Sequence, residues 1–389
     1  LFFAVNISAF VPPDEFTHAG ICKVFAQTFL FPDNSPATYE FGLVTNIPWL
    51  YYWIMGKLLH LNIFDISDLV FLRLLNIPLA FGTIYFVRQT LLLLTRNKLT
   101  QLLLLVAMTN TAMFSLLSAS VSYDNLTNLL AAMSIYYLMD FFTHRSTDSL
   151  YATGICQLTG CLTKITFLPL ALVLNVLLVI YIGRDSRDFL NMLQCHYKES
   201  GRRFWLLALT VLFVSGLNLQ LYGENYLRYG ILNPQMATIL SPAAAMNYPL
   251  DARGTIFNQY KDGNLSFMDA LILTGEMKHP GNKADTFFLL MNYEKLKMNP
   301  QLWLGPLSYS WVWVENMVVS VFGIKAHLIM VKDLPWRIPI YVVFLLSILG
   351  YVIRWRLREE GWLPPALIAI ICFYAGYFMY EINYSSYLN

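Results

Sequence analysis

Residues 165–182 read ITFLPLALVLNVLLVIYI, a run without a charged side chain. A helix that crosses a membrane needs about 20 mostly apolar residues, so this segment predicts a membrane-spanning helix. The composition agrees, because 57% of the 389 residues are hydrophobic, only 13% are charged and the mean hydropathy is +0.51. Soluble domains are more polar than this, and we therefore predict an integral membrane protein.

Other apolar windows repeat this pattern along the chain. Five approach the length of a full span with almost no internal charge, namely residues 74–94, 99–117, 126–142, 204–222 and 336–353. A shorter span over 150–162, a last span over 362–380 and an opening remnant over 1–10 complete the series. We expect an all-α fold, a polytopic bundle of about nine or more transmembrane helices.

Basic residues mark one set of connections between these spans. They are Arg96, Lys98, His144, Arg145, Arg184, Arg187, Lys198, Arg202, Arg203, Arg354, Arg356 and Arg358. Cytoplasmic loops carry an excess of Lys and Arg, so we place this set inside. Alternation of the spans then places the polar clusters outside: residues 11–18, the turn over 118–124, Lys164, the segment 223–335 and the stretch 380–384.

The same pattern divides the chain into three parts. Residues 1–222 form a transmembrane module that includes a first external loop over 11–72. Trp and Tyr crowd residues 46–53 of that loop, which suits the headgroup level and predicts an interfacial helix. Residues 223–335 form a small external insertion with a second interfacial helix over 311–322. Residues 336–389 hold the C-terminal transmembrane helices.

Several functional classes are excluded by composition and motif. The formal net charge is only +2 and the basic residues are scattered among short loops, so we exclude nucleic-acid binding. The glycine-rich and P-loop motifs of nucleotide enzymes are absent from the sequence. No cysteine has C-x-x-C or Cys/His ligand spacing, so we expect small apolar side chains rather than disulfides or metal ligands. The five are Cys22, Cys156, Cys161, Cys195 and Cys372.

A polar motif, PPDEFTH, follows the opening remnant at residues 12–18. Carboxylates beside a membrane are costly and are candidates for function. If a helix begins here, Asp14 and Glu15 lie one turn before His18 on the same face, suited to accepting a proton from a hydroxyl or to ligating a divalent metal. The alternative is structural, because prolines and carboxylates also begin ordinary helices.

Three other charged residues each have a structural and a functional interpretation. Asp124, or Ser122 beside it, would cap the helix that follows the external turn. Lys164 interrupts an apolar stretch over 150–182. It would either extend to the membrane surface or bind an anion such as a phosphate. Arg73, at the outer end of its span, has the same two interpretations.

Taken together, these motifs resemble a GT-C type membrane glycosyltransferase, the superfamily of the protein O-mannosyltransferases and the lipid A aminoarabinose transferases. The closest resemblance is to a large bacterial family of uncharacterised membrane proteins with a P-P-D-E-x-x-H signature after the first span. Residues 12–18 match that signature at every fixed position. Residues 48–52 (PWLYY) are similar to a P-P-L-Y-Y string, Arg73 to the R-L start of the second span, and residues 162–164 to an L-T-K string.

Other strings match in part. Residues 120–124 (SVSYD) resemble the external S-P-D motif, with Tyr123 in place of the proline. Residues 322–324 (FGI) resemble an F-G-W stretch without its Trp. Residues 383–387 (NYSSY) stand where the family has a G-R-Y string, and they lack the arginine. The resemblance covers most of the chain from residue 11 to residue 387.

The resemblance implies transfer of a sugar from a polyprenyl-phosphate donor to a glycan, lipid or protein acceptor on the periplasmic or extracellular face. Asp14 would be the general base for the acceptor hydroxyl, and Glu15, also catalytic, and Asp124 would orient the substrates or a metal. Lys164 and Arg73 would hold the donor phosphate and stabilise its leaving charge. An apolar groove between the spans would hold the prenyl tail.

Further residues are implied in substrate and metal binding. His18, Tyr51 and Tyr52 would bind substrate. The superfamily leaves the need for a divalent metal such as Mg or Mn open, and the residues that would hold one are Asp14, Glu15, His18 and Asp124. The implied location is the bacterial inner (plasma) membrane, with membrane lipid and other membrane subunits as partners.

Two other functional classes stay open on the sequence. A lipid-linked saccharide transporter would need polar residues along a path through the middle of the membrane, whereas the mid-span positions are nearly all apolar. A non-catalytic GT-C-fold subunit of a larger membrane assembly would keep the fold and lose parts of the site. The departures at Tyr123 and at residues 385–386 are compatible with the second of these.

Overall fold

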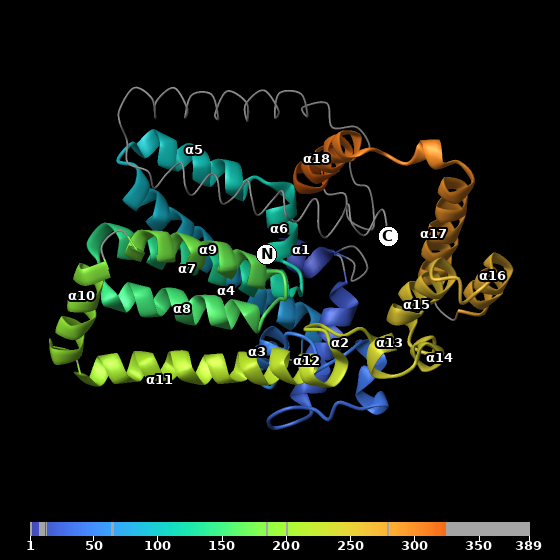
Figure 1. Cartoon of the computed structure of the whole chain (residues 1–389), viewed down its shortest axis with the longest axis horizontal. Helices are drawn as coiled ribbons and strands as arrows, with labels where there is room; N and C mark the ends of the chain where they lie inside the picture. The colour runs from blue at the N-terminus through green and yellow to red at the C-terminus, as the bar shows by residue number, and fades with distance from the viewer. Residues whose placement is uncertain are drawn as a thin grey trace.

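The computed structural model describes residues 2–7, 12, 14–63, 66–183, 186–199, 201–277 and 280–323, which form helices, turns and loops without a strand (Figure 1). The all-α prediction is confirmed for these residues. Of the opening remnant, the described part is α1 (Phe2–Asn6) with Ile7. The expected spans over 336–353 and 362–380, the arginines at 184, 354, 356 and 358, Ile324, the string 383–387 and Cys372 lie outside the described residues.

A bundle of helices occupies the centre of the molecule. Its members are α4 (Asp68–Leu94), α7 (Tyr123–His144), α8 (Thr147–Cys161), α9 (Phe167–Gly183) and α11 (Gly201–Asn218). α4 packs against α7, α7 against α8, and α8 against both α9 and α11. Figure 1 shows α7, α8, α9 and α11 side by side, with α10 (Ser186–Glu199) crossing one end. Ser67, Ser122 and Ser146 begin α4, α7 and α8 by accepting a hydrogen bond from a first-turn N–H, which is the usual N-cap.

The first loop folds over the opposite end of the bundle. α2 (Glu15–Ala26) packs against α3 (Leu50–Leu59) and the short helix η1 (Pro36–Phe41). Gly56 allows α3 to approach α2 closely, because a Cβ at this position would lie 2.6 Å from the carbonyl oxygen of Cys22. The aromatic segment predicted as an interfacial helix over 46–53 therefore contributes the start of α3. Its tyrosines, Tyr51 and Tyr52, are buried in the core.

The window predicted as one span over 99–117 forms two helices. α5 (Lys98–Thr109) ends before α6 (Ala112–Ser118) begins. The side chains of Thr109, Asn110 and Thr111 all donate hydrogen bonds back to carbonyls of α5. Such local side-chain bonds compete with helix continuation. The hydropathy of the window is high, but three adjacent polar residues interrupt it.

Two helices among the described residues are long and apolar enough to cross a membrane. One is α4, and the other is the 29-residue stretch Gly201–Tyr229. This second stretch runs through α11, a π-helical turn η2 (Leu219–Gly223) and α12 (Glu224–Tyr229). α5 and α9 are apolar but shorter. The structure therefore supports two candidate spans by length and composition, and α9 covers most of the run 165–182.

The two ends of the bundle differ in charge. One end, which we call the Arg202 end, gathers the C-termini of α4, α7 and α9, the crossing helix α10 and the N-termini of α5, α8 and α11 (Figure 1). The basic residues that we predicted to lie on one side of the membrane belong, where the structure describes them, to the helix termini and connections of this end. The other end, which we call the Asp14 end, carries the start of α2, the turn before α7 and the connection between α8 and α9. The predicted separation into two sets of connections is present in the described helices.

The insertion predicted over 223–335 is largely helical where the structure describes it. It comprises α12, α13 (Met236–Ile239), α14 (Pro242–Ala245), α15 (Pro249–Lys261), α16 (Phe267–Glu276), α17 (Pro280–Met298), η3 (Pro300–Leu302) and α18 (Pro306–Gly323). α15, α16 and α17 pack on one another around Ile256, Tyr260 and Leu290. The amide of Asn225 in α12 donates to the carbonyl oxygen of Asn46 at 2.8 Å, which ties the insertion to the first loop. The predicted interfacial helix over 311–322 lies within α18.

Candidate functional site

Asp14 lies immediately before α2 in a left-handed backbone conformation, with φ 52° and ψ 14°. Non-glycine residues seldom adopt this region, and Asp is among those that tolerate it. Its side chain makes no capping hydrogen bond to the helix and is exposed. A helix does begin here, with Asp14 in the N-cap position and Glu15 in the first turn, but the Asp14 side chain does not make the capping hydrogen bond. The carboxylate is accessible to a substrate.

Glu15 points into the protein and forms a buried ion pair with Arg73 of α4. Nε of Arg73 donates to Oε1 of Glu15 at 2.8 Å, and Nη2 donates to Oε2 at 2.5 Å. Nη1 of Arg73 donates to the carbonyl oxygens of Ala4 and Ile7 at 3.2 and 2.8 Å. Oε1 of Glu15 also accepts from the backbone N–H of Val121 at 2.9 Å. One bidentate pair thus ties α1, α2, α4 and the turn before α7 together.

The burial of this pair changes the roles expected for both residues. Glu15 is 0% exposed and Arg73 is 1% exposed. Protein groups engage Arg73 at Nε, Nη1 and Nη2 and engage both carboxylate oxygens of Glu15, so neither residue is placed to touch a donor phosphate or an acceptor. We therefore assign Glu15 and Arg73 a positioning role, in which they fix the start of α2 and with it the place of Asp14.

A second buried network surrounds Tyr51. Nδ2 of Asn76 donates to the Tyr51 hydroxyl at 3.0 Å. Nδ2 of Asn125 donates to Oδ1 of Asn76 at 3.1 Å and to the carbonyl oxygens of Leu117 and Ser120 at 2.8 and 3.1 Å. Buried polar groups need such partners. Tyr51 is 0% exposed, so the structure places it in the support of the site and not at a substrate surface.

His18 and Tyr52 lie beside Tyr123 at the Asp14 end. Nδ1 of His18 is hydrogen-bonded to the Tyr52 hydroxyl at 2.8 Å. The His18 ring meets the ring of Tyr123 edge to face, with centroids 4.5 Å apart. Burial is the largest cause that lowers the pKa of His18 to about 4. The charges of Asp14 and Asp124 raise this pKa and that of Lys164 lowers it, so all three act on the imidazole.

The lowered pKa of His18 predicts an acid-sensitive fold. Between about pH 6.5 and pH 4 the unfolded chain binds a proton at His18 that the folded chain does not, so stability falls as the pH falls through this window. From the pKa shift we expect wild type to lose about 3 kcal/mol there through this group. Unfolding measured at pH 7.5 and pH 4.5 should therefore show a smaller pH dependence for His18→Asn. An exposed histidine changed in the same way, His60→Asn, should keep the wild-type pH dependence, and equal slopes for all three proteins would contradict the prediction.

Asp124 in the first turn of α7 forms an ion pair with Lys164, which lies in the connection between α8 and α9. Nζ of Lys164 donates to Oδ1 of Asp124 at 2.5 Å. The ammonium also lies 4.7 Å from the centre of the Tyr123 ring. Of the two candidate caps, Ser122 and Asp124, it is Ser122 that caps α7, because its side chain accepts a hydrogen bond from the backbone N–H of Asp124. The side chains of Lys164 and Asp124 are 24% and 32% exposed, so both remain accessible to a ligand.

The residues expected to hold a divalent metal do not form a ligand set. No group of three or more His, Cys, Asp or Glu side chains among the described residues is arranged to hold a metal ion. Both oxygens of Glu15 are taken by Arg73, Nδ1 of His18 by Tyr52 and Oδ1 of Asp124 by Lys164. The described donor set therefore does not fit a divalent metal, and we derive no step through one.

The structure brings five of the eight predicted residues together; Asp14, Asp124 and Lys164 have exposed or half-buried side chains, and His18 and Tyr52 are buried beside them. We call this group the Asp14 cluster: Asp14, His18, Tyr52, Asp124 and Lys164. Glu15, Arg73 and Tyr51 lie behind it as support. The sequence did not single out Asn76 as part of the site, although a polar residue inside an apolar window is a recognised signal of function. Among the cysteines, Cys22, Cys156 and Cys161 are buried and free, and Cys195 is exposed and free.

No family model, curated protein or solved structure matches this chain.

Proposed function

We propose that the chain is a GT-C type membrane glycosyltransferase that moves a sugar from a polyprenyl-phosphate donor to an acceptor hydroxyl on the periplasmic or extracellular face of a bacterial inner membrane. The observation that carries the proposal is the Asp14 cluster. It combines an accessible carboxylate that can accept a proton with an accessible ammonium that can bind a phosphate. These are the two groups that such a transfer requires.

The surface of the helices supports a membrane location. The most apolar window of Gly201–Tyr229 is only 11% buried within the protein. Leu206, Leu212 and Phe213 on α11 are each about two-thirds exposed. In water, a helix that is apolar around its circumference is expected to be buried, and lipid removes that cost. We propose that α9 and α11 face lipid and that further spans complete a polytopic bundle.

The charge asymmetry of the bundle supports the proposed sidedness. The Arg202 end carries Arg96, Lys98 and Arg202, which suit the cytoplasmic side. The Asp14 cluster lies at the other end of the same helices. This arrangement supports our proposal that the chemistry takes place on the outer face, where a lipid carrier presents its sugar and phosphate at the level of the headgroups.

The proposed reaction is a single displacement at the anomeric carbon. The acceptor hydroxyl gives its proton to the carboxylate of Asp14, and its oxygen forms a bond to the anomeric carbon. The bond between that carbon and the phosphate oxygen breaks, and the phosphate leaves with the electron pair. Lys164 stabilises the charge that develops on the phosphate, which is electrostatic catalysis. His18 stays neutral at pH 7 because its pKa is about 4, so its buried side chain adds no charge that would compete with Lys164.

Of the two cations of the site, Arg73 and Lys164, the one with the exposed side chain would bind the donor phosphate. Arg73 has 1% of its surface exposed, whereas the side chain of Lys164 is 24% exposed and pairs with one carboxylate oxygen of Asp124. A lysine has three donors, so Lys164 can bind a phosphate oxygen while it keeps the bond to Asp124. We propose that Asp124 orients Lys164 toward the phosphate.

The enzyme is favoured over the transporter by the place of the charges. Both strong ion pairs of the site, Glu15 with Arg73 and Asp124 with Lys164, lie at the Asp14 end of the bundle. A transporter needs polar groups near the middle of the membrane. The test is to supply the purified full chain in lipid nanodiscs with polyprenyl-phosphate sugars and acceptor-containing membrane extract. We expect labelled sugar in the acceptor and free polyprenyl phosphate. A donor that stays intact would refute the proposal. So would a donor that stays intact and is only carried across the membrane when the chain is placed in liposomes.

Removal of the Lys164 charge gives a first prediction for this mechanism. Lys164→Gln should lower the transfer rate about 10²–10³-fold, the usual effect of losing one preorganised donor to developing charge. Lys164→Arg should retain part of the rate because the charge remains. Lys23→Gln is the matched control, since Lys23 forms an ion pair with Asp68 at 3.0 Å outside the Asp14 cluster. If Lys164→Gln folds with the thermal stability of wild type and transfers sugar at the wild-type rate, Lys164 does not bind the donor phosphate.

A further inference from the structure

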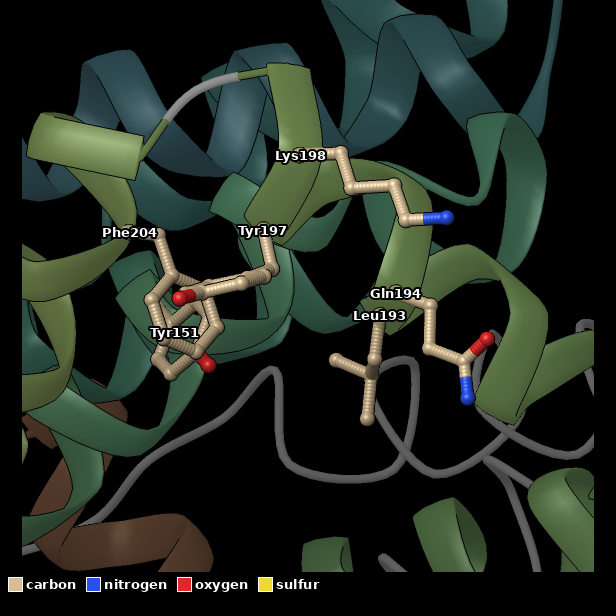
Figure 2. A pocket seen from close by; sticks show the side chains of 6 residues that line it. All are labelled: Tyr151, Leu193, Gln194, Tyr197, Lys198 and Phe204. Carbon is tan, nitrogen blue, oxygen red and sulfur yellow. The ribbon is translucent and has the colours of Figure 1, made fainter.

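A cavity of about 290 Å³ opens at the Arg202 end, away from the Asp14 cluster. It lies between α8, α10 and the start of α11, and it is lined by Tyr151, Leu193, Gln194, Tyr197, Lys198 and Phe204. Figure 2 shows the rings of Tyr151, Tyr197 and Phe204 gathered on one side of it and Leu193 and Gln194 on the other. Nothing in the proposed transfer reaction uses this cavity.

The walls of the cavity are mainly apolar and aromatic. The ring of Phe204 lies 5.9 Å from that of Tyr151 and 5.3 Å from that of Tyr197. These rings and Leu193 form a surface suited to hydrocarbon, and the amide of Gln194 lies at its margin (Figure 2). A site of this kind, apolar with a few polar groups, is typical of small-molecule and lipid binding.

α10 lies across the bundle end as an amphipathic helix. Phe189 and Met192, one turn apart, pack against the buried cluster of α7 and α9 that includes Leu138 and Leu174. Asn191, Gln194 and Lys198 are exposed. A helix that buries one face against apolar groups and presents polar groups on the other is suited to the plane of a membrane surface. The cavity therefore opens at the depth of lipid headgroups if the proposed membrane location is correct.

Lys198 lines the cavity, and Arg202 lies two residues before the lining residue Phe204 in the chain. Lys198 and Arg202 are exposed and make no ion pair with any side chain that the structure describes. Arg203, in contrast, is held by Asp148 at 2.8 Å. The Lys198 side chain extends from α10 away from the three rings, and its ammonium lies on the Gln194 side of the cavity (Figure 2). An apolar cavity bordered by an ammonium that pairs with no carboxylate among the described side chains is complementary to a ligand that joins hydrocarbon to a negative charge.

We propose that this cavity binds an anionic phospholipid of the leaflet at the Arg202 end, with its glycerol and upper acyl carbons against Tyr151, Tyr197 and Phe204 and its phosphate at Lys198. The inference rests on the membrane location in the proposed function and is independent of the transfer chemistry. Anionic lipid headgroups bind basic pockets on the cytoplasmic side of membrane proteins. The charge of Lys198 gives selectivity over zwitterionic lipid, and the rings supply the apolar contact.

The test measures retained lipid by native mass spectrometry of the full chain, purified in detergent and mixed with phosphatidylglycerol or phosphatidylcholine. Wild type should retain one phosphatidylglycerol in preference to phosphatidylcholine. Lys198→Gln should lower that preference about fivefold, the effect of one cation at a lipid surface. Leu193→Trp should abolish retention by filling the cavity. Lys295→Gln, which removes an exposed lysine of the insertion, should retain lipid as wild type does.

The outcomes separate this inference from the proposed function. Equal phosphatidylglycerol retention by Lys198→Gln and Lys295→Gln, or equal binding of both lipids by wild type, would overturn the lipid site. Selective retention without any sugar transfer would support the lipid site and refute the enzyme. Transfer without selective retention would do the reverse. If Leu193→Trp fails to fold, the comparison of the two lysine variants decides alone.

Discussion

Replacement of Asp14 by Asn is expected to lower the rate of sugar transfer by about 10²–10⁴-fold, the contribution of a general base. The amide has the shape of the carboxylate but cannot accept the proton of the acceptor hydroxyl. Asn also tolerates the left-handed backbone that Asp14 adopts at φ 52°, so the start of α2 should keep its conformation. His18 cannot take over, because its buried imidazole is engaged by Tyr52. The rate is measured with the polyprenyl-phosphate donor at saturating acceptor concentration.

The control for this variant is Asp33→Asn. Asp33 is an exposed carboxylate of the same first loop and is not part of the Asp14 cluster. We expect its variant to transfer sugar at the wild-type rate, and we expect both variants to unfold at the wild-type temperature within a few degrees. If Asp14→Asn transfers sugar as fast as Asp33→Asn, Asp14 is not the base. If neither variant nor wild type transfers sugar, the non-catalytic subunit becomes the better interpretation.

The helices and their ends could largely be predicted from the sequence. Apolar windows over 126–142, 150–162 and 165–182 correspond to α7, α8 and α9 because helix length and hydropathy are local properties. The placement of the basic connections at one end of the bundle could be predicted as well, because successive apolar windows alternate in direction. The window over 99–117 was wrong as a single span, because averaged hydropathy does not register the three side chains at 109–111 that bond back to the helix.

The division of labour inside the site could not be predicted from the sequence. Glu15 and Arg73 are 58 positions apart, and nothing local indicates that they meet as a buried pair. The resemblance therefore implied a catalytic role for Glu15, orienting substrates or a metal, and a role for Arg73 in holding the donor phosphate. Two other residues of the matched motifs, Asp14 and Lys164, keep accessible side chains. Asp14 lies just before α2 and Lys164 lies between α8 and α9, where the chain turns. Direction of a side chain at a helix start depends on tertiary packing, which a motif does not specify.

The cavity that α10 lines together with α8 and α11 could not be predicted from the sequence either. Tyr151, Leu193 and Phe204 come from three different helices, and only the crossing of α10 over the bundle brings them together. α10 carries charged and polar residues between its apolar ones, so no window marked it as a membrane span. A connection of this kind would ordinarily be assigned to solvent, and its apolar face becomes informative only when the bundle end is known.

Loss of the Arg73 side chain is expected to cost the largest share of stability in the described part of the chain. Arg73→Ala leaves the carboxylate of Glu15, which is 0% exposed, without its charged partner. Removal of one member of a buried ion pair typically costs about 3–5 kcal/mol. The carbonyl oxygens of Ala4 and Ile7 lose their donor as well. Unfolding of the variant in detergent, followed by circular dichroism, should show this loss against wild type.

A double variant distinguishes the cost of an unpaired charge from the loss of packing. Arg73→Met with Glu15→Met removes both charges at similar volume, and such replacements are often near neutral in stability. Here recovery should be incomplete, because the backbone N–H of Val121 loses its acceptor, and a buried group without a partner costs about 1–3 kcal/mol. Arg228→Ala is the control, since its pair with Glu224 is exposed on α12 and such pairs contribute at most about 1 kcal/mol. Arg73→Ala and Arg228→Ala with equal stability would show that the Glu15 pair does not hold α2. The start of α2, and therefore Asp14, would then need another anchor, which makes this measurement a direct test of the positioning role.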